Sequence, residues 1–290
     1  MRILHLSDTH VRRETGADAR GVDARESLRR ILHDCAEIPG LDALVLTGDV
    51  ADDGSREAYA DVRDLLAAFT REQGIPAYVT TGNHDERHAF TQVLGTGHAD
   101  RPITHLESAD GERAAVSTVR GVRIVTLDSL VPGKGYGLLS RTQLDWLRAV
   151  LAGPAPHGTV VAFHHPPIHV PGVAVQRALG LQNPAELAEA IAGSDVRLLL
   201  CGHFHLQLTG ALGGVPVWVT PGVVNRIDLT AAHGTERTVR GASASVVDLP
   251  EDGPPVMHTV HAHDPRAGAT LHHADAVEVS EIIAKLGPEP

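Results

Sequence analysis

The hydrophobic pattern of this chain predicts strands buried on both faces and helices buried on one. Apolar residues recur at helical spacing over Ala24–Glu37 and Arg56–Glu72, between the first three of five almost wholly apolar runs. Those five runs are Arg2–Leu6, Ala43–Thr47, Ala77–Thr80, Thr159–Phe163 and Arg197–Cys201. Doubly covered strands that alternate with helices are typical of an α/β fold.

The second half of the chain adds β-hairpin patterns to this alternation. Arg120-Gly121 and Gly213-Gly214 separate short apolar runs, as two-residue hairpin turns do. Helix starts are expected at Ser140, with Gln143 as its capping-box partner, and at Asn183-Pro184. The apolar runs beside the turns, with one later strand, are Ala114–Val119, Val122–Leu127, Leu206–Leu212, Val215–Val219 and Ala244–Leu249. We expect a mixed sheet, or two packed sheets with helices outside.

Composition and charge narrow the class of protein. The chain has 290 residues, of which 42% are hydrophobic and 21% charged, as in ordinary globular proteins. Its formal net charge of -11 disfavours a nucleic-acid polymer as partner, but a local cluster of cations still admits a small phosphorylated substrate. Cys35 and Cys201 form no metal or redox motif, and no stretch is long enough for a transmembrane segment. The N-terminal MRILHLSDTH reads as a strand, so we expect a cytoplasmic enzyme.

Polar residues of metal-binding type follow each of the five apolar runs. In open α/β sheets, ligands gather outside the carboxyl ends of the strands, so these segments are expected to converge. The segments are Asp8-Thr9-His10, Gly48-Asp49, Gly82-Asn83-His84-Asp85, His164-His165-Pro166 and Gly202-His203-Phe204-His205. Any one of these segments alone would be read as an ordinary turn or as the site of an ordinary surface histidine. Together they bury about eight polar side chains, at a cost of several kcal/mol each unless a cation compensates.

The donor set predicts two metal ions. Oxygen and nitrogen donors without a thiolate suit Mn or Fe, with Zn or Co as alternatives, rather than a structural zinc site. The donors are too many for one ion, so two divalent or mixed-valence ions that share a carboxylate are the expected arrangement.

The order of these five motifs resembles the calcineurin-like metallophosphoesterase superfamily. The stretches GDVADDGSREAY and DSLVPGKGYGLLSRTQLDWL are further similar to class III cyclic nucleotide phosphodiesterases and their glycerophosphodiesterase relatives. The resemblance implies a four-layer αββα sandwich of two mixed sheets flanked by helices, with a dinuclear metal site at the strand C-terminal ends. It implies a metallophosphoesterase domain over residues 1–262. Residues 263–290 are then a C-terminal tail or a strap on a partner subunit, with a short helix near Val277–Leu286.

The resemblance also implies roles for individual residues. Asp49 would bridge the two metals, and His164 is chosen over His165 because the family's ligand lies two residues before the proline. His84 would be the catalytic proton donor, oriented by Asp85 unless Asp85 caps a helix. The first metal would be held by Asp8, His10, Asp49 and His205, and the second by Asp49, Asn83, His164 and His203. The expected substrate contacts are Asn83, His84, His205 and, more weakly, His169.

The expected function is hydrolysis of a small phosphodiester by a metal-bridging hydroxide. The leading substrate is 3',5'-cyclic AMP, with 2',3'-cyclic nucleotides in addition. A glycerophosphodiesterase or a broad-specificity phosphodiesterase is the alternative, and a non-catalytic metal-bound scaffold is a third interpretation. Residues 166–182 and 225–240 are expected to form the rims of the cleft, and a homodimer is a further expectation.

Overall fold

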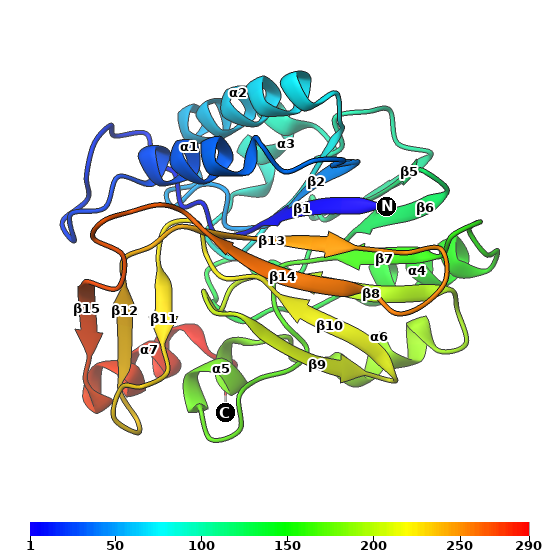
Figure 1. The fold of residues 1–290 in the computed structure, drawn as a ribbon. Coiled ribbons are helices and arrows are strands. Elements are labelled where there is room, and N and C mark those ends of the chain that lie inside the picture. The colour runs from blue at the N-terminus through cyan, green and yellow to red at the C-terminus, as the bar shows by residue number, and fades with distance from the viewer. Residues whose placement is uncertain (290) are drawn as a thin grey trace.

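The protein contains two large mixed β-sheets that pack face to face. The structure, a computed structural model, describes residues 1–289 (Figure 1). The first sheet has the order β14 (Val256–His261), β13 (Ser243–Asp248), β1 (Arg2–Leu6), β2 (Ala43–Thr47) and β3 (Ala77–Thr80). The second has the order β4 (Thr104–Glu107), β5 (Arg113–Val119), β6 (Val122–Thr126), β7 (Thr159–Ala162), β8 (Val196–Cys201), β10 (Val215–Val219) and β9 (Leu208–Leu212).

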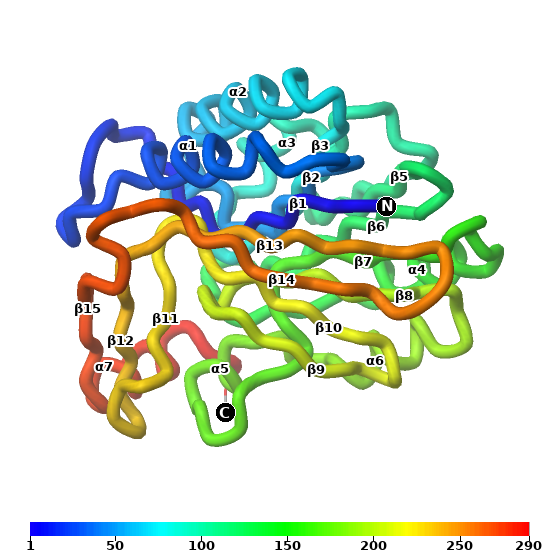
Figure 2. Tube along the Cα trace, viewed as in Figure 1, coloured from blue at the N-terminus to red at the C-terminus, as the bar shows by residue number. Residues whose placement is uncertain are grey.

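Helices cover the outer face of each sheet. The first sheet is covered by α1 (Ala24–Cys35), α2 (Arg56–Gln73) and α3 (Arg87–Leu94), as Figure 2 also shows. The second is covered by α4 (Arg141–Leu151) and α6 (Pro184–Ile191). The shorter α5 (Ala174–Leu179) lies below the second sheet. The predicted αββα sandwich is therefore confirmed.

Alternation along β1 explains why the strands are apolar throughout. Leu4 belongs to the outer core together with Leu28 of α1, whereas Ile3 belongs to the core between the sheets together with Val160 of β7. A strand that lies between a helix layer and a second sheet has no face toward water, so each position needs an apolar side chain.

The helix termini agree with the sequence signals except at Gln143 and Asn183. Gln143 closes no capping box, because its Oε1 accepts a hydrogen bond from the Asp128 amide at 2.9 Å and its Nε2 donates one to the Asp128 carbonyl at 2.7 Å. Ser55 caps α2 by accepting a hydrogen bond from the Ala58 amide, and Ser140 caps α4 in the same way. Asn183 precedes α6 as predicted, but its side chain makes no capping bond. It instead accepts a hydrogen bond from the Leu139 amide at 3.1 Å. The helix begins at Pro184, whose fixed φ suits the first position.

A third, smaller sheet and a C-terminal helix lie beside the sandwich, and the sequence pattern does not predict this sheet. It has the order β11 (Arg226–Asp228), β12 (Glu236–Val239) and β15 (Thr270–Ala274), and α7 (Ala276–Leu286) follows it. The C-terminal segment thus contributes a strand and a helix to the fold, and α7 packs against α5. Division of the chain at residue 262 stays a prediction.

Strand direction determines where polar residues meet. β1, β2 and β3 are mutually parallel, and so are β6, β7, β8 and β10. The carboxyl ends of β1, β2, β3, β7 and β8 therefore open at one side of the sandwich. Within residues 1–289, none of the helices has the length and hydrophobicity that a membrane span requires.

Candidate dinuclear metal site

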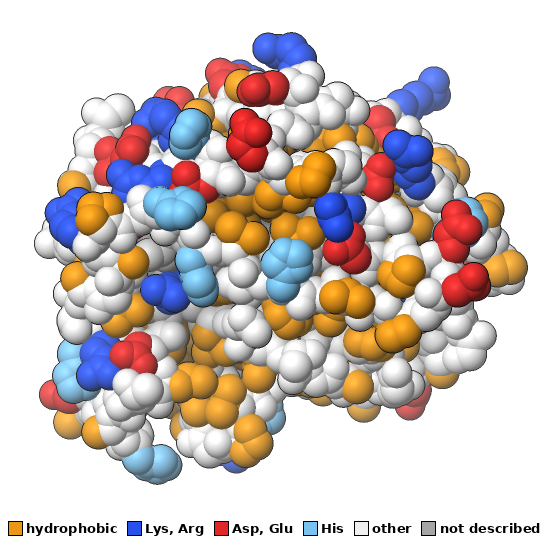
Figure 3. Space-filling view, in the orientation of Figure 1, with side chains coloured by type: hydrophobic (Ala, Val, Ile, Leu, Met, Phe, Trp, Pro, Cys, Tyr) orange, Lys and Arg blue, Asp and Glu red, His pale blue; other side chains and the backbone are white. Residues whose placement is uncertain are grey.

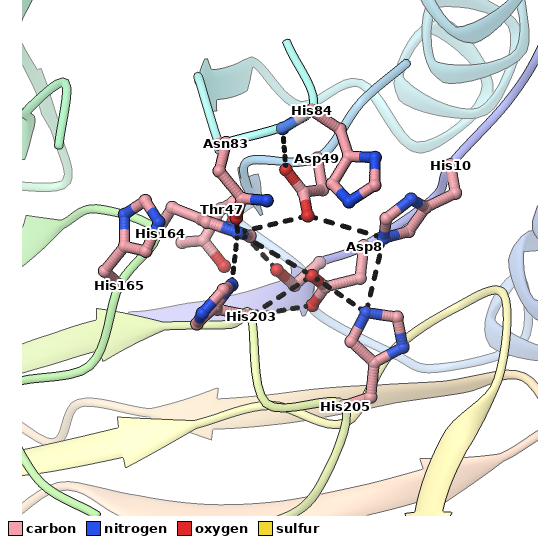
Figure 4. Close-up of polar contacts among 12 residues, drawn as sticks. Asp8, His10, Thr47, Asp49, Asn83, His84, His164, His165, His203 and His205 are labelled. Atoms are coloured by element: carbon pink, nitrogen blue, oxygen red, sulfur yellow. Dashed lines mark hydrogen bonds and ion pairs between the residues drawn. The ribbon is translucent and has the colours of Figure 1, made fainter. Parts of the chain in front are cut away.

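The five strand ends bring their acidic and imidazole side chains together, as Figure 4 shows. Donor atoms of Asp8, His10 and His205 lie within 4.8 Å of one another, as do those of Asp8, Asp49 and His164. These side chains come from segments almost two hundred residues apart, so only the tertiary fold joins them.

The backbone at this cluster has an unusual conformation. Six residues other than glycine have positive φ within residues 1–289, and five of them are predicted ligands. They are Asp8 (58°), His10 (45°), Asp49 (47°), His203 (70°) and His205 (50°). This conformation costs free energy for residues with a Cβ, and such strain concentrates at functional sites. It turns each side chain sharply toward the common centre as soon as its strand ends.

The donor atoms form two groups that share Asp49. In the first group, His205 Nε2 lies 3.3 Å from Asp8 Oδ1 and 3.3 Å from His10 Nε2. Asp49 Oδ2 lies 3.4 Å from His10 Nε2, which joins it to this group.

In the second group, His164 Nε2 lies 3.3 Å from the same Asp49 oxygen and 3.2 Å from Asn83 Oδ1. His203 Nδ1 lies 3.2 Å from His164 Nε2. The structure thus brings all seven predicted ligands together, with Asp49 between the two groups.

Three imidazoles are oriented by hydrogen bonds on the side away from the cluster. His10 Nδ1 lies 2.9 Å from Asp52 Oδ1, and His164 Nδ1 lies 2.7 Å from the Thr47 carbonyl oxygen. His205 Nδ1 lies 2.7 Å from Asn225 Oδ1. An acceptor at Nδ1 keeps the proton there and leaves Nε2 as the free donor atom, which is how proteins orient metal-binding histidines.

The electrostatics of the cluster favour a positive charge at its centre. Burial opposes ionisation of Asp8, but His205 and His164 outweigh it and lower the pKa of Asp8 to about 2. Burial likewise opposes protonation of His164, but the charge of Asp49 raises the pKa of His164 to about 9. The buried carboxylates therefore stabilise a positive charge among the converging imidazoles, as they would stabilise a cation.

The donor set fits two metal ions. Asp8 and Asp49 are 0% and 2% exposed, and pairs of imidazole nitrogens face each other at 3.2–3.3 Å. Burial lowers the pKa of His203 to about 3, which keeps it in the neutral form that binds metals. Nitrogen and oxygen donors without a thiol suit ions such as Mn, Fe, Co and Zn.

Comparison with known proteins identifies the family. Residues 1–207 match the calcineurin-like phosphoesterase family. The chain belongs to this family. Its relatives include a probable cyclic nucleotide phosphodiesterase of Rhodococcus erythropolis, 38% identical over 83% of this chain and 76% of that protein. Another is a cAMP/cGMP dual specificity phosphodiesterase of Mycobacterium tuberculosis, 37% identical over 83% of this chain and 73% of that protein.

Solved structures confirm the fold of this phosphoesterase. A dimetal phosphatase from Danio rerio superposes with a TM-score of 0.59 over 89% of this chain and 98% of its own, at 14% identity. A likeness at this identity concerns the fold alone. Family membership, together with the curated relatives, makes the chain a phosphodiester hydrolase.

His84 lies at the edge of the phosphoesterase's metal cluster. Its amide donates a hydrogen bond to Asp49 Oδ1 at 2.9 Å, and its Nδ1 lies 3.2 Å from Asp52 Oδ1. The side chain is 41% exposed, so it faces the solvent side of the cluster. Desolvation opposes protonation, but Asp49 and Asp52 raise the pKa of His84 to about 10. Cations beside Asp49 would counteract this rise.

His165 and Asp85 lie next to proposed ligands in the sequence but have other partners in the structure. His164, not His165, contacts Asp49, while His165 Nδ1 bonds Ser129 Oγ at 2.8 Å. Asp85 neither orients His84 nor caps α3. Its carboxylate accepts hydrogen bonds from the amides of residues 50, 51 and 82, and Glu86 is the cap of α3. The partner of His84 is instead Asp52, three residues after Asp49 in the segment that follows β2.

A cavity of 240 Å³ adjoins the metal cluster. The expected rims do line it: Val175 and Leu179 come from α5, and Ile227 comes from β11. Ile282 of α7 and Glu236 of β12 complete the wall. Figure 3 shows hydrophobic side chains gathered over α5.

His169 has no place in this wall. Its side chain is exposed and does not line the cavity, since the chain after Pro166-Pro167 runs along the surface before it enters α5. The expected substrate contact of His169 therefore has no support from the cavity wall.

Proposed function

We propose that this phosphoesterase hydrolyses cyclic nucleotides, with 3',5'-cyclic AMP as the main substrate and 2',3'-cyclic nucleotides in addition. The observation that carries the proposal is a cavity of 240 Å³ whose floor is the predicted metal cluster and whose wall combines apolar side chains with a few polar ones. A phosphate at the floor leaves the nucleoside against that wall. The curated relatives named as cyclic nucleotide phosphodiesterases support this substrate class.

The proposed ligands divide as the geometry groups them. Asp8, His10 and His205 hold one ion, and Asn83, His164 and His203 hold the other, with Asp49 shared between the two. Two such ions, Mn or Fe by preference, supply Lewis acidity toward phosphate oxygens and lower the pKa of a bound water. Asp52, Thr47 and Asn225 keep three of the imidazoles in orientation.

His84 is proposed to donate a proton to the leaving alkoxide. Its imidazole lines the cavity beside His10, with ring centroids 4.6 Å apart, and is held by Asp52. The Asp52 carboxylate favours the imidazolium form, which is the form that donates. Asn83 and His205 also face the site and complete the proposed contacts to the phosphate.

A substrate panel tests the proposal. The protein is loaded separately with Mn, Fe, Co or Zn and assayed with 3',5'-cyclic AMP, 2',3'-cyclic AMP, glycerophosphocholine and a phosphomonoester. We expect the highest kcat/KM for 3',5'-cyclic AMP. A preference for glycerophosphocholine would contradict the substrate class. A fully loaded protein that is inert toward every diester, including bis(p-nitrophenyl) phosphate, would instead favour a metal-bound scaffold.

A further inference from the structure

The cavity wall contains one carboxylate that the metal site and its supporting hydrogen bonds do not use. Glu236 lies on β12, where its backbone pairs with Ala274 of β15, and its half-buried side chain lines the cavity together with Ile227 and Ile282. The strand ladder fixes its position relative to the metal cluster. His205 of that cluster lies close enough to influence its ionisation.

Glu236 has no partner for its charge. Over residues 1–289, no hydrogen bond or salt bridge involves its carboxylate. The cations nearby have other partners: Arg237 binds Asp228 at 2.7 Å, and His272 Nε2 lies 2.9 Å from Glu278 Oε1. Arg20, which lines the same cavity, pairs with Asp18 at 3.2 Å. A carboxylate in a partly apolar cavity loses hydration without compensation unless a ligand supplies a donor.

A fixed amide on the other side of the cavity complements this acceptor. Gln176 of α5 is 5% exposed, and its Oε1 accepts a hydrogen bond from the Val170 amide at 2.9 Å. This bond orients the carboxamide, whose NH2 group has no hydrogen-bond partner among the described residues. The cavity wall thus contains an oriented donor at Gln176 and an unpaired acceptor at Glu236, next to apolar side chains and to the polar Arg20, Asn225 and Thr238. A few placed polar groups in a partly apolar wall are the pattern of a site that fixes a ligand's orientation.

We propose that Glu236 is a specificity-determining residue that accepts a hydrogen bond from the nucleoside part of the substrate. This inference rests on the proposed cyclic nucleotide phosphodiesterase function. The donor is either the ribose 2'-hydroxyl or the exocyclic amine of the base, and both have the same chemistry toward a carboxylate. The charge of Glu236 also repels a second phosphate on that side, which disfavours oligonucleotides.

The experiment compares three substrates in the metal-loaded protein and its Glu236→Ala and Glu236→Gln variants. They are 3',5'-cyclic AMP, its 2'-deoxy analogue, and the 3',5'-cyclic phosphate of purine riboside, which lacks the amine. Bis(p-nitrophenyl) phosphate reports the metal chemistry without a nucleoside. Glu281→Ala, which removes an exposed glutamate of α7, is the matched control. Metal content and thermal unfolding are measured for each variant.

In Glu236→Ala, we expect kcat/KM for cyclic AMP to fall about tenfold relative to the aryl diester, because a hydrogen bond to a charged acceptor is lost. Glu236→Gln keeps an acceptor oxygen and should recover part of the loss. The wild type should discriminate against one analogue, which identifies the donor, and Glu236→Ala should lose that discrimination.

Two outcomes separate the inference from the proposed function. Rapid hydrolysis of cyclic AMP with the same analogue preference in the wild type and in Glu236→Ala would overturn the role of Glu236 alone. Hydrolysis of the aryl diester without hydrolysis of cyclic AMP in the wild type would overturn the proposed function and, with it, this inference.

Discussion

Asp52 connects a proposed metal ligand to the proposed acid. Its Oδ1 lies 2.9 Å from His10 Nδ1 and 3.2 Å from His84 Nδ1. Burial alone would raise the pKa of this carboxyl, but the hydrogen bonds to the two imidazoles lower it well below its usual range. Asp52 thus remains ionised while it orients both rings, so a change at this residue affects metal binding and proton transfer together.

Replacement of His84 separates these two functions. His84→Ala removes the proposed proton donor but none of the proposed ligands, so metal content should remain. We expect kcat on cyclic AMP to fall about 10²–10⁴-fold, because a poor alkoxide leaving group depends on general acid catalysis. Aryl diesters, whose leaving groups need no proton, should lose much less.

The matched control is His88→Ala, four residues later. His88 is exposed, and within residues 1–289 its imidazole hydrogen-bonds only to Gln92. Equal losses on alkyl and aryl substrates in His84→Ala would rule out an acid role.

The buried His98 should make the free energy of unfolding depend on pH, whether or not metals are bound. It is 7% exposed, and its ring nitrogens lie 2.8 Å from Ser117 Oγ and 2.9 Å from Thr126 Oγ1. Burial lowers its pKa to about 4. Between pH 6.5 and 4 the unfolded chain therefore binds a proton that the folded chain does not, and the free energy of unfolding falls as the pH falls, by up to about 1.4 kcal/mol per unit.

Denaturant unfolding of metal-free protein between pH 4 and 7.5 measures this slope. His98→Gln should reduce it by about one proton in that window, whereas His88→Gln controls for loss of a histidine from the unfolded chain. Identical slopes in the wild type and His98→Gln would contradict the assignment.

At the scale of the elements, the turn after β8 requires glycine at residue 202, because there is no room for a Cβ there. A Cβ at Gly202 would overlap Ser7 Oγ and come within 2.9 Å of Asp8 Oδ2. Ser7 Oγ donates a hydrogen bond to the Thr47 carbonyl at 2.8 Å, so its displacement disturbs the ends of β1 and β2 together.

Gly202→Ala should therefore weaken both stability and metal binding. We expect a loss of about 1–3 kcal/mol in the free energy of unfolding, as for other overpacked sites. Gly153→Ala is the control, because a Cβ at that position meets nothing within 4 Å. Calorimetry and elemental analysis give the two measurements, and unchanged metal content in Gly202→Ala would contradict this account of the turn.

At the scale of the whole molecule, the metal cluster joins the two sheets. β1, β2 and β3 of the first sheet and β7 and β8 of the second each supply proposed ligands. Ions that bind only when both sheets are assembled stabilise the folded state by mass action, by about 3–4 kcal/mol at 100–1,000 times the dissociation constant.

Chelation should accordingly lower the unfolding midpoint, and added Mn should restore it. Asp49→Ala, which removes the shared carboxylate, should show no metal-dependent shift and little bound metal by elemental analysis. A normal metal-dependent shift in Asp49→Ala would mean that the ions bind elsewhere.

The sandwich could be predicted because each of its central strands is buried on both faces and therefore reads as an apolar run. The third sheet could not, since β11 has only three residues and β15, with the sequence TLHHA, is polar. The proposed ligands directly follow predicted strands, so they could be recognised in the sequence. Asn225 and Glu236 lie in the segment 225–240 that was expected to form a rim, but no local pattern distinguishes them from the other residues of that segment.

The cavity is completed by the last helix of the chain, while the first residue is far from it. The Met1 amine donates a hydrogen bond to the Leu249 carbonyl at 2.9 Å, at the end of β1 opposite to Asp8, whereas Ile282 of α7 lines the cavity. During synthesis, all seven proposed ligands therefore emerge before the helix that completes the cavity wall. For the same reason, we expect an affinity tag placed after α7 to lie near the cavity, and loss of α7 by proteolysis to open the cavity wall while every proposed metal ligand is retained.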